Sequence, residues 1–115
     1  MKFTESLKKN TDFVYVYKNG KSYVNKYIVM YVLENNSNSN RLGISASKKI
    51  GNSVVRHRFS RLVKESYRLH ENIFNSGLDI VVVARKSAAS ASYSEIESAL
   101  LHLAKIHHIL KIYFY

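Results

Sequence analysis

The chain has 115 residues, a formal net charge of +10 and no cysteine. This length suits one domain, residues 1–115, with one modest core, and the lack of cysteine excludes disulfides and thiolate metal sites, which fits a cytoplasmic location. The positive charge indicates an anionic partner, with nucleic acid ahead of a membrane, because no window holds the roughly 18 to 20 apolar residues of a membrane span.

The chain is predicted to start with one short helix. Residues 1–9 are polar and basic, and we expect them to be loosely ordered. Asn10 can cap a helix that Gly20 ends, although the β-branched and aromatic residues between them would equally suit a strand. As a helix, the segment places Phe13 and Tyr17 one turn apart on one face.

Strands are predicted next. Residues 21–33 are rich in Tyr, Val and Ile, and alternation places Val29 and Tyr31 on the same face. Both faces of this run are apolar, so it is covered on both sides or lines a cleft. The Asn- and Ser-rich turn that follows is expected to form a hairpin into a strand over residues 41–47. One face of that strand is core, and the other, which includes Ser45, is small and polar.

A strongly amphipathic helix follows, and Asn52 or Ser53 can cap its start. At 100° per residue, one side of this helix is apolar and the other is basic. The apolar side comprises Val55, Phe59, Leu62, Val63 and Leu69. The basic stripe comprises His57, Arg61, Lys64 and Arg68, with Arg56 and Arg58 at its boundary.

Positive charge repeated at each turn of a rigid helix suits a phosphate backbone, and arginine binds phosphate through two parallel hydrogen bonds. The basic pair Lys48 and Lys49 precedes the helix, and only Glu65 opposes these charges. The alternative is a solvated helix face, whereas the near absence of acids favours contact with nucleic acid.

The last third of the chain adds a strand and a helix. Residues 79–85 form a continuous apolar run, as expected at the centre of a sheet, parallel to the strand before the basic helix. Residues 93–112 repeat apolar side chains at helical spacing, with Ser94 and Glu97 placed for a capping box. The aromatic tail, residues 111–115, is expected to pack back onto the body. The order α-β-β-β-α-β-α predicts an α+β (α/β) two-layer sandwich.

No catalytic or metal site is predicted in the chain. His102, His107 and His108 lack the i, i+4 spacing that places two ligands on one helix face. The eight acidic residues form no paired cluster of the kind that holds Mg²⁺ in protein nucleases.

Several spaced motifs together resemble the bacterial ribonuclease P protein subunit. They are Arg-Leu-Gly-Ile-Ser (41–45), Ser-Lys-Lys-Ile-Gly-Asn (47–52) and Val-Val-Arg-His-Arg-Phe-Ser-Arg-Leu (54–62), and similarity extends over nearly the whole chain. The family carries Arg-Asn-Arg where this chain has Arg56, His57 and Arg58. Histidine can still donate a hydrogen bond. The substitution therefore weakens the assignment of one contact more than it weakens the resemblance to the family.

The resemblance implies an endoribonuclease that removes the 5′ leader of precursor tRNA. Its catalytic groups and Mg²⁺ would lie mainly in a catalytic RNA subunit, bound by one monomeric protein per RNA. It also implies a left-handed β-α-β crossover, as in the second domain of a ribosomal protein, although such crossovers are right-handed in about 98% of cases. The residues implied to dock on the RNA subunit are Lys48, Lys49, Asn52, Arg56, His57, Arg58, Arg61, Lys64 and Arg68.

The resemblance further implies an aromatic cleft between the first helix and the sheet, which holds the single-stranded leader. Its residues would be Phe13, Tyr17, Val29, Tyr31 and Ser45, a set that the predicted faces also bring together. From the residues alone, the alternative is that these aromatic side chains are core. A ribosomal-protein-like rRNA-binding module is the alternative function, and the small number of acids argues against a self-sufficient metal nuclease.

Overall fold

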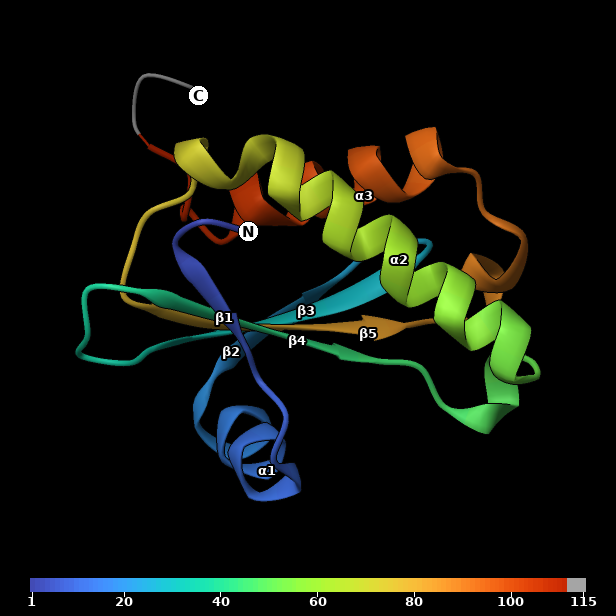
Figure 1. Ribbon diagram of the computed structural model, residues 1–115, viewed down its shortest axis with the longest axis horizontal. Helices are drawn as coiled ribbons and strands as arrows, with labels where there is room; N and C mark the ends of the chain where they lie inside the picture. The colour runs from blue at the N-terminus through green and yellow to red at the C-terminus, as the bar shows by residue number, and fades with distance from the viewer. Residues whose placement is uncertain (112–115) are drawn as a thin grey trace.

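The computed structural model describes residues 1–111, so residue 112 of the predicted last helix and nearly all of the predicted aromatic tail lie outside it. Three consecutive strands separate the first helix from the second, and one strand separates the second helix from the third (Figure 1). The strands and helices are β1 (Thr4–Ser6), α1 (Asn10–Asn19), β2 (Lys21–Val24), β3 (Ile28–Glu34), β4 (Asn40–Ser45), α2 (Ser53–His70), β5 (Leu78–Ala84) and α3 (Tyr93–Ile106). Short 3₁₀ turns lie at Lys48–Ile50, Glu71–Ile73 and Lys86–Ser90.

The strands form one mixed sheet in the order β1-β4-β5-β3-β2. Strand β5 is central, parallel to β4 and antiparallel to β3, which confirms the predicted parallel pair and the buried central strand. Helices α2 and α3 cover one face, and α1 lies against the other (Figure 1). The predicted α+β architecture is therefore confirmed, and its element order holds from α1 onward.

The predicted hairpin between β3 and β4 is wrong, because β5 lies between these two strands. Strand β5 is buried on both faces from Leu78 to Val82, so the centre of the sheet removes the most apolar surface from water there. The hairpin in the structure joins β2 to β3, which together replace the predicted single run. The break between them comes from Asn25, whose side-chain oxygen accepts hydrogen bonds from the backbone N–H groups of Tyr27 and Ile28.

The N-terminal segment is ordered, contrary to prediction. Strand β1 pairs in parallel with β4, and Leu7 is only 5% exposed. The Glu71 carboxylate accepts hydrogen bonds from the backbone N–H groups of Lys2 at 2.8 Å and Phe3 at 3.0 Å. The strand pairing and the bonds to Glu71 use the backbone of this segment, so its polar composition gave no sign of them.

Helix boundaries differ from the prediction by a few residues. Lys9, and not Asn10, is the residue before α1. Ser92 and Glu95 form the capping box of α3, two residues ahead of the predicted pair. The helix ends at Ile106, because His108 has a φ of 58° and cannot continue it.

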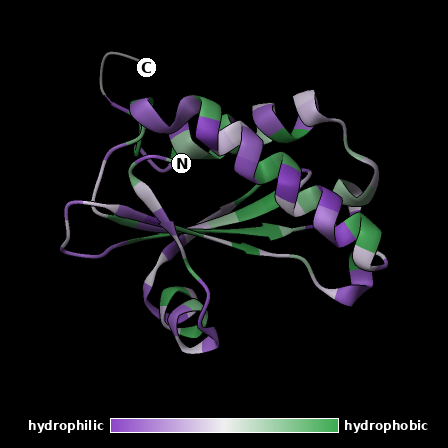
Figure 2. Cartoon of the chain, in the orientation of Figure 1, coloured by the Kyte–Doolittle hydropathy of each residue, from purple (hydrophilic) through white to green (hydrophobic). Residues whose placement is uncertain are grey.

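The apolar side of α2 is buried against the sheet, where Phe59, Val63 and Tyr67 are fully buried. Figure 2 shows the central strands in the hydrophobic colour and α2 banded by hydrophobic and hydrophilic residues. Leu69, predicted on the apolar side, is 52% exposed. Leu69 lies two turns after the half-buried Leu62, at the edge of the apolar side. Tyr67 occupies the core position at this end of the helix instead.

One ion pair is built into the sheet. Asp79 is 2% exposed and accepts two hydrogen bonds from Arg41, from Nε at 2.9 Å and from Nη2 at 2.6 Å. The Asn35 amide donates a third bond at 3.0 Å. Burial alone would raise the pKa of Asp79, but the bonds from Arg41 and Asn35 outweigh it and hold the pKa below its ordinary value.

We predict that Arg41→Ala lowers the free energy of unfolding by about 3 to 5 kcal/mol at about pH 7, because it leaves a buried carboxylate unpaired. The stabilisation by Asp79 is present above its ordinary pKa and is lost as the pH falls through the lower pKa of the folded state. The difference in free energy of unfolding between wild type and variant should therefore become smaller toward about pH 3. Urea unfolding at about pH 7 and about pH 3 measures this difference, and the same difference at both pH values would contradict the prediction.

Candidate RNA-binding surfaces

The basic stripe on α2 is held outward by the burial of the opposite side of the helix. Of the two predicted caps, Asn52 and Ser53, Asn52 is the one that caps the helix, because its side-chain oxygen accepts a hydrogen bond from Val55 N–H at 3.1 Å. All four residues of the stripe are exposed, and Arg56 and Arg58 at its boundary are half-buried. His57, Ser60, Arg61 and Lys64 line a hollow of about 480 Å³ on this outer side.

Some cations of α2 already have hydrogen-bond or ion-pair partners within the fold, and others do not. Arg68 pairs with Glu65 at 2.6 Å, and Arg58 donates to the Ala91 carbonyl at 2.8 Å. Arg58 therefore contacts the body of the fold instead of projecting freely from it. Within residues 1–111, neither Arg61 nor Lys64 has an ion-pair partner, so their charges are the most available to an anion.

Arg56 has a polar atom that the described fold leaves unsatisfied. Its Nε is buried and has no hydrogen-bond partner among residues 1–111. A buried donor without a partner costs free energy.

The predicted pair Lys48 and Lys49 is exposed on the Lys48–Ile50 turn. This turn lies against the Lys86–Ser90 turn, which brings the exposed residues Arg85 and Lys86 to the same edge of the fold. Sequence reasoning did not include these two cations. The positive edge they form follows from the parallel pairing of β4 with β5, whose ends both lead into it.

The predicted leader residues gather on the opposite face of the sheet, beside α1. The ring centroids of Phe13 and Tyr17 are 6.3 Å apart, and those of Tyr17 and Tyr31 are 4.9 Å apart. Phe13 packs on Gly43, where an added Cβ would come within 2.8 Å of its ring. The small face of β4 thus receives the aromatic side chain of α1.

Sheet register brings in the rest of the set. Val29 of β3 and Ser45 of β4 both lie opposite Val83 of β5, so the three form one row across the sheet. Val83 was missed because the predicted hairpin left no strand between β3 and β4. We call the five predicted residues together with Val83 the aromatic surface.

The aromatic surface is not simply core. Tyr17 is 36% exposed, and the other members are half-buried. The fully buried side chains on this face are instead Leu7, Val16 and Val81. Partly exposed rings above a floor of valines offer faces on which bases can stack.

Most of the eight carboxylates are already engaged within the fold. Residues 1–111 contain no group of three or more His, Cys, Asp or Glu side chains arranged to hold a metal ion. The engaged carboxylates are Asp12, Glu65, Glu71, Asp79, Glu95 and Glu97.

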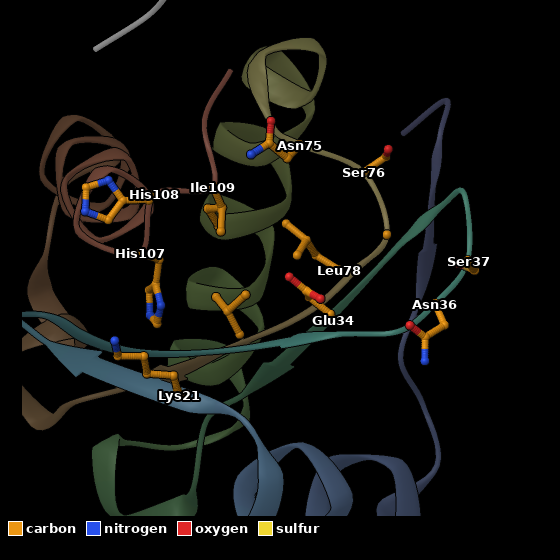
Figure 3. Close-up of a pocket in the computed structure, with 12 residues that line it drawn as sticks. Lys21, Glu34, Asn36, Ser37, Asn75, Ser76, Leu78, His107, His108 and Ile109 are labelled. Carbon is orange, nitrogen blue, oxygen red and sulfur yellow. The ribbon is translucent and has the colours of Figure 1, made fainter. Parts of the chain in front are cut away.

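A separate pocket of about 520 Å³ lies where β3 ends and β5 begins, and none of the predicted site residues lines it (Figure 3). Lys21, Glu34 and His107 contribute to its wall. His107 donates from Nε2 to the Met30 carbonyl at 2.8 Å, and burial lowers the pKa of its imidazole. A neutral His107 therefore fastens the end of α3 to β3, which is a structural role.

No helix of residues 1–111 is long and apolar enough to cross a membrane.

Known proteins resemble this chain over nearly its full length. The family model described as Ribonuclease P matches residues 1–108. The Ribonuclease P protein component of Lachnoclostridium phytofermentans is 64% identical over 107 residues, which cover 93% of this chain and 92% of that protein. The protein of the same name from Clostridioides difficile is 47% identical, over 89% of this chain and 90% of that protein.

Solved structures show the same fold. The RNase P protein of Staphylococcus aureus superimposes with a TM-score of 0.85 at 36% identity, covering 92% of this chain and 97% of that one. The Thermotoga maritima RNase P protein gives a TM-score of 0.81 at 32% identity, covering 89% and 96%. With this sequence match and this shared fold, the chain belongs to the ribonuclease P protein family.

Proposed function

We propose that the protein is the RNA-binding subunit of a ribonuclease P ribonucleoprotein that removes the 5′ leader of precursor tRNA. In this proposal the basic stripe docks on the catalytic RNA subunit, together with Lys48, Lys49, Asn52, Arg56 and Arg58. The aromatic surface holds the leader. The observation that carries the proposal is that α2, with the basic stripe, and α1, beside the aromatic surface, lie on opposite faces of one sheet. Figure 1 shows the two helices on these opposite faces.

Two opposed surfaces suit a protein that bridges two RNAs. The basic stripe offers charge without base-reading geometry, which suits a folded RNA backbone. The aromatic surface offers partly exposed rings for stacking, which suits unpaired nucleotides of varied sequence. A ribosomal-protein-like rRNA-binding module needs only the first of these, so the aromatic surface favours ribonuclease P.

Magnesium enters the proposal through the RNA. Most carboxylates of this chain already accept hydrogen bonds or pair with cations, so its own residues do not fit a protein-held Mg²⁺ site. Mg²⁺ would be held mainly by the RNA subunit and the substrate. The protein would contribute affinity and orientation, and its share of the rate would come from positioning.

A reconstitution experiment tests the function. Purified protein is incubated with labelled precursor tRNA and Mg²⁺, with and without candidate RNA subunits. We expect cleavage at the 5′ end of the mature tRNA only when an RNA subunit is present. Cleavage by the protein alone would refute the proposal and indicate a self-sufficient nuclease.

For the basic stripe, we predict that Arg61→Ala weakens binding to the RNA subunit and lowers the salt slope of log K by about 0.7 to 0.9 for one lost phosphate contact. The fold should be retained, because Arg61 is exposed and has no ion-pair partner within residues 1–111. Lys105→Ala, on the exposed side of α3, removes the same charge elsewhere and is the control. Equal slopes for both variants would mean that the stripe is only a solvated face.

For the aromatic surface, we predict that Tyr17→Ala weakens binding of precursor tRNA to the holoenzyme by about 1 to 3 kcal/mol, the energy of one stacked base. Mature tRNA, which lacks the leader, should bind as before. Tyr15→Ala is the matched control, because Tyr15 is 62% exposed on another side of α1.

A core role for Tyr17 gives a different result for the same variant. It would lower the melting temperature strongly and weaken both forms of tRNA together. Measuring the melting temperature with both affinities therefore separates the two roles, and equal losses for the two tRNAs would reject the aromatic surface.

A further inference from the structure

Helix α1 is attached to the sheet by few buried side chains. Val16 is its only buried residue. Phe13 rests on Gly43 near the start of the helix, and Gly20 follows its end, where an added Cβ would lie 2.7 Å from the Val16 carbonyl oxygen and 3.0 Å from that of Val32. An element with so little burial opens locally at low cost, so other contacts decide how firmly its aromatic side chains are placed.

Arg41 supplies a contact of this kind. Its Nε and Nη2 bind both oxygens of the buried Asp79, which fixes the plane of the guanidinium group. The remaining nitrogen, Nη1, lies 3.4 Å from Oδ2 of Asp12 in the first turn of α1. Arg41 thereby links the centre of the sheet to the residue that directly precedes Phe13.

The three linked side chains become more exposed with distance from the centre of the sheet. The Asp79 carboxylate is 3% exposed, whereas the side chains of Arg41 and Asp12 are 35% and 34% exposed. The inner pair is therefore rigid, and the outer contact is a partly solvated ion pair that can be changed without disturbing the core. The outer contact joins the first turn of α1 to the sheet.

We propose that Arg41 and Asp12 are positioning residues for leader binding, because they hold α1 so that Phe13 and Tyr17 are ready to stack on nucleotides. The inference rests on the proposed function of the aromatic surface. Neither residue needs to touch the RNA. Their contribution is to reduce the ordering cost that the leader would otherwise meet on binding.

Asp12→Ala tests the proposal, because it removes the outer contact and leaves the pair of Arg41 with Asp79 in place. The measured quantity is the ratio of holoenzyme affinities for precursor and mature tRNA, with Tyr17→Ala as a reference. We expect Asp12→Ala to lower this ratio about two- to five-fold, the range of a partly exposed ion pair. Asp12→Glu, which keeps a carboxylate within reach of Arg41, should restore much of the ratio.

Thr11→Ala is the matched control, because Thr11 is exposed in the same turn of α1, and it should leave the ratio unchanged. An unchanged ratio for Asp12→Ala, with a lower one for Tyr17→Ala, would overturn the proposal and leave the aromatic surface standing. Equal losses for the two tRNAs with a lower melting temperature would also overturn it, because the contact would then be structural only. No effect of Tyr17→Ala on the ratio would instead reject the aromatic surface itself.

Discussion

The parallel pairing of β4 with the buried strand β5 determines where the two surfaces lie. Parallel neighbours need a crossover, and α2 is that crossover, so it must lie over one face of the sheet. Its apolar side packs into the core, where Phe59, Val63 and Tyr67 are fully buried. The basic stripe is left facing outward, and α1, which comes earlier in the chain, lies against the other face.

The two surfaces are built by different physical means. The basic stripe depends on one helix whose orientation is fixed by burial, so its charges keep their spacing without any partner. The aromatic surface is assembled from α1 and strands β3, β4 and β5, and its key helix has one buried residue. Its geometry consequently rests on specific contacts, namely Phe13 on Gly43 and the link from Asp79 through Arg41 to Asp12.

Local pattern was enough to predict α2, a cap at Asn52 or Ser53 and the exposure of the basic stripe, because each depends on neighbours within one or two turns. The five residues predicted to bind the leader do lie on one face of the sheet beside α1, a grouping to which the resemblance contributed, and their role there stays a proposal. The hairpin and Val83 were missed for one reason: the place of β5 between β3 and β4 depends on pairings far apart in the chain. The contact between Arg41 and Asp79 has the same origin, since 38 residues separate them.

The proposed function requires the basic stripe and the aromatic surface to bind two different RNAs independently. A double-mutant cycle with Arg61→Ala, Tyr17→Ala and the combined variant tests this claim, with the free energy of forming the complex of protein, RNA subunit and precursor tRNA as the readout. Independent surfaces predict that the two losses add to within about 0.5 kcal/mol. A coupling energy above about 1 kcal/mol would contradict the account, because it would mean that both side chains serve one shared contact.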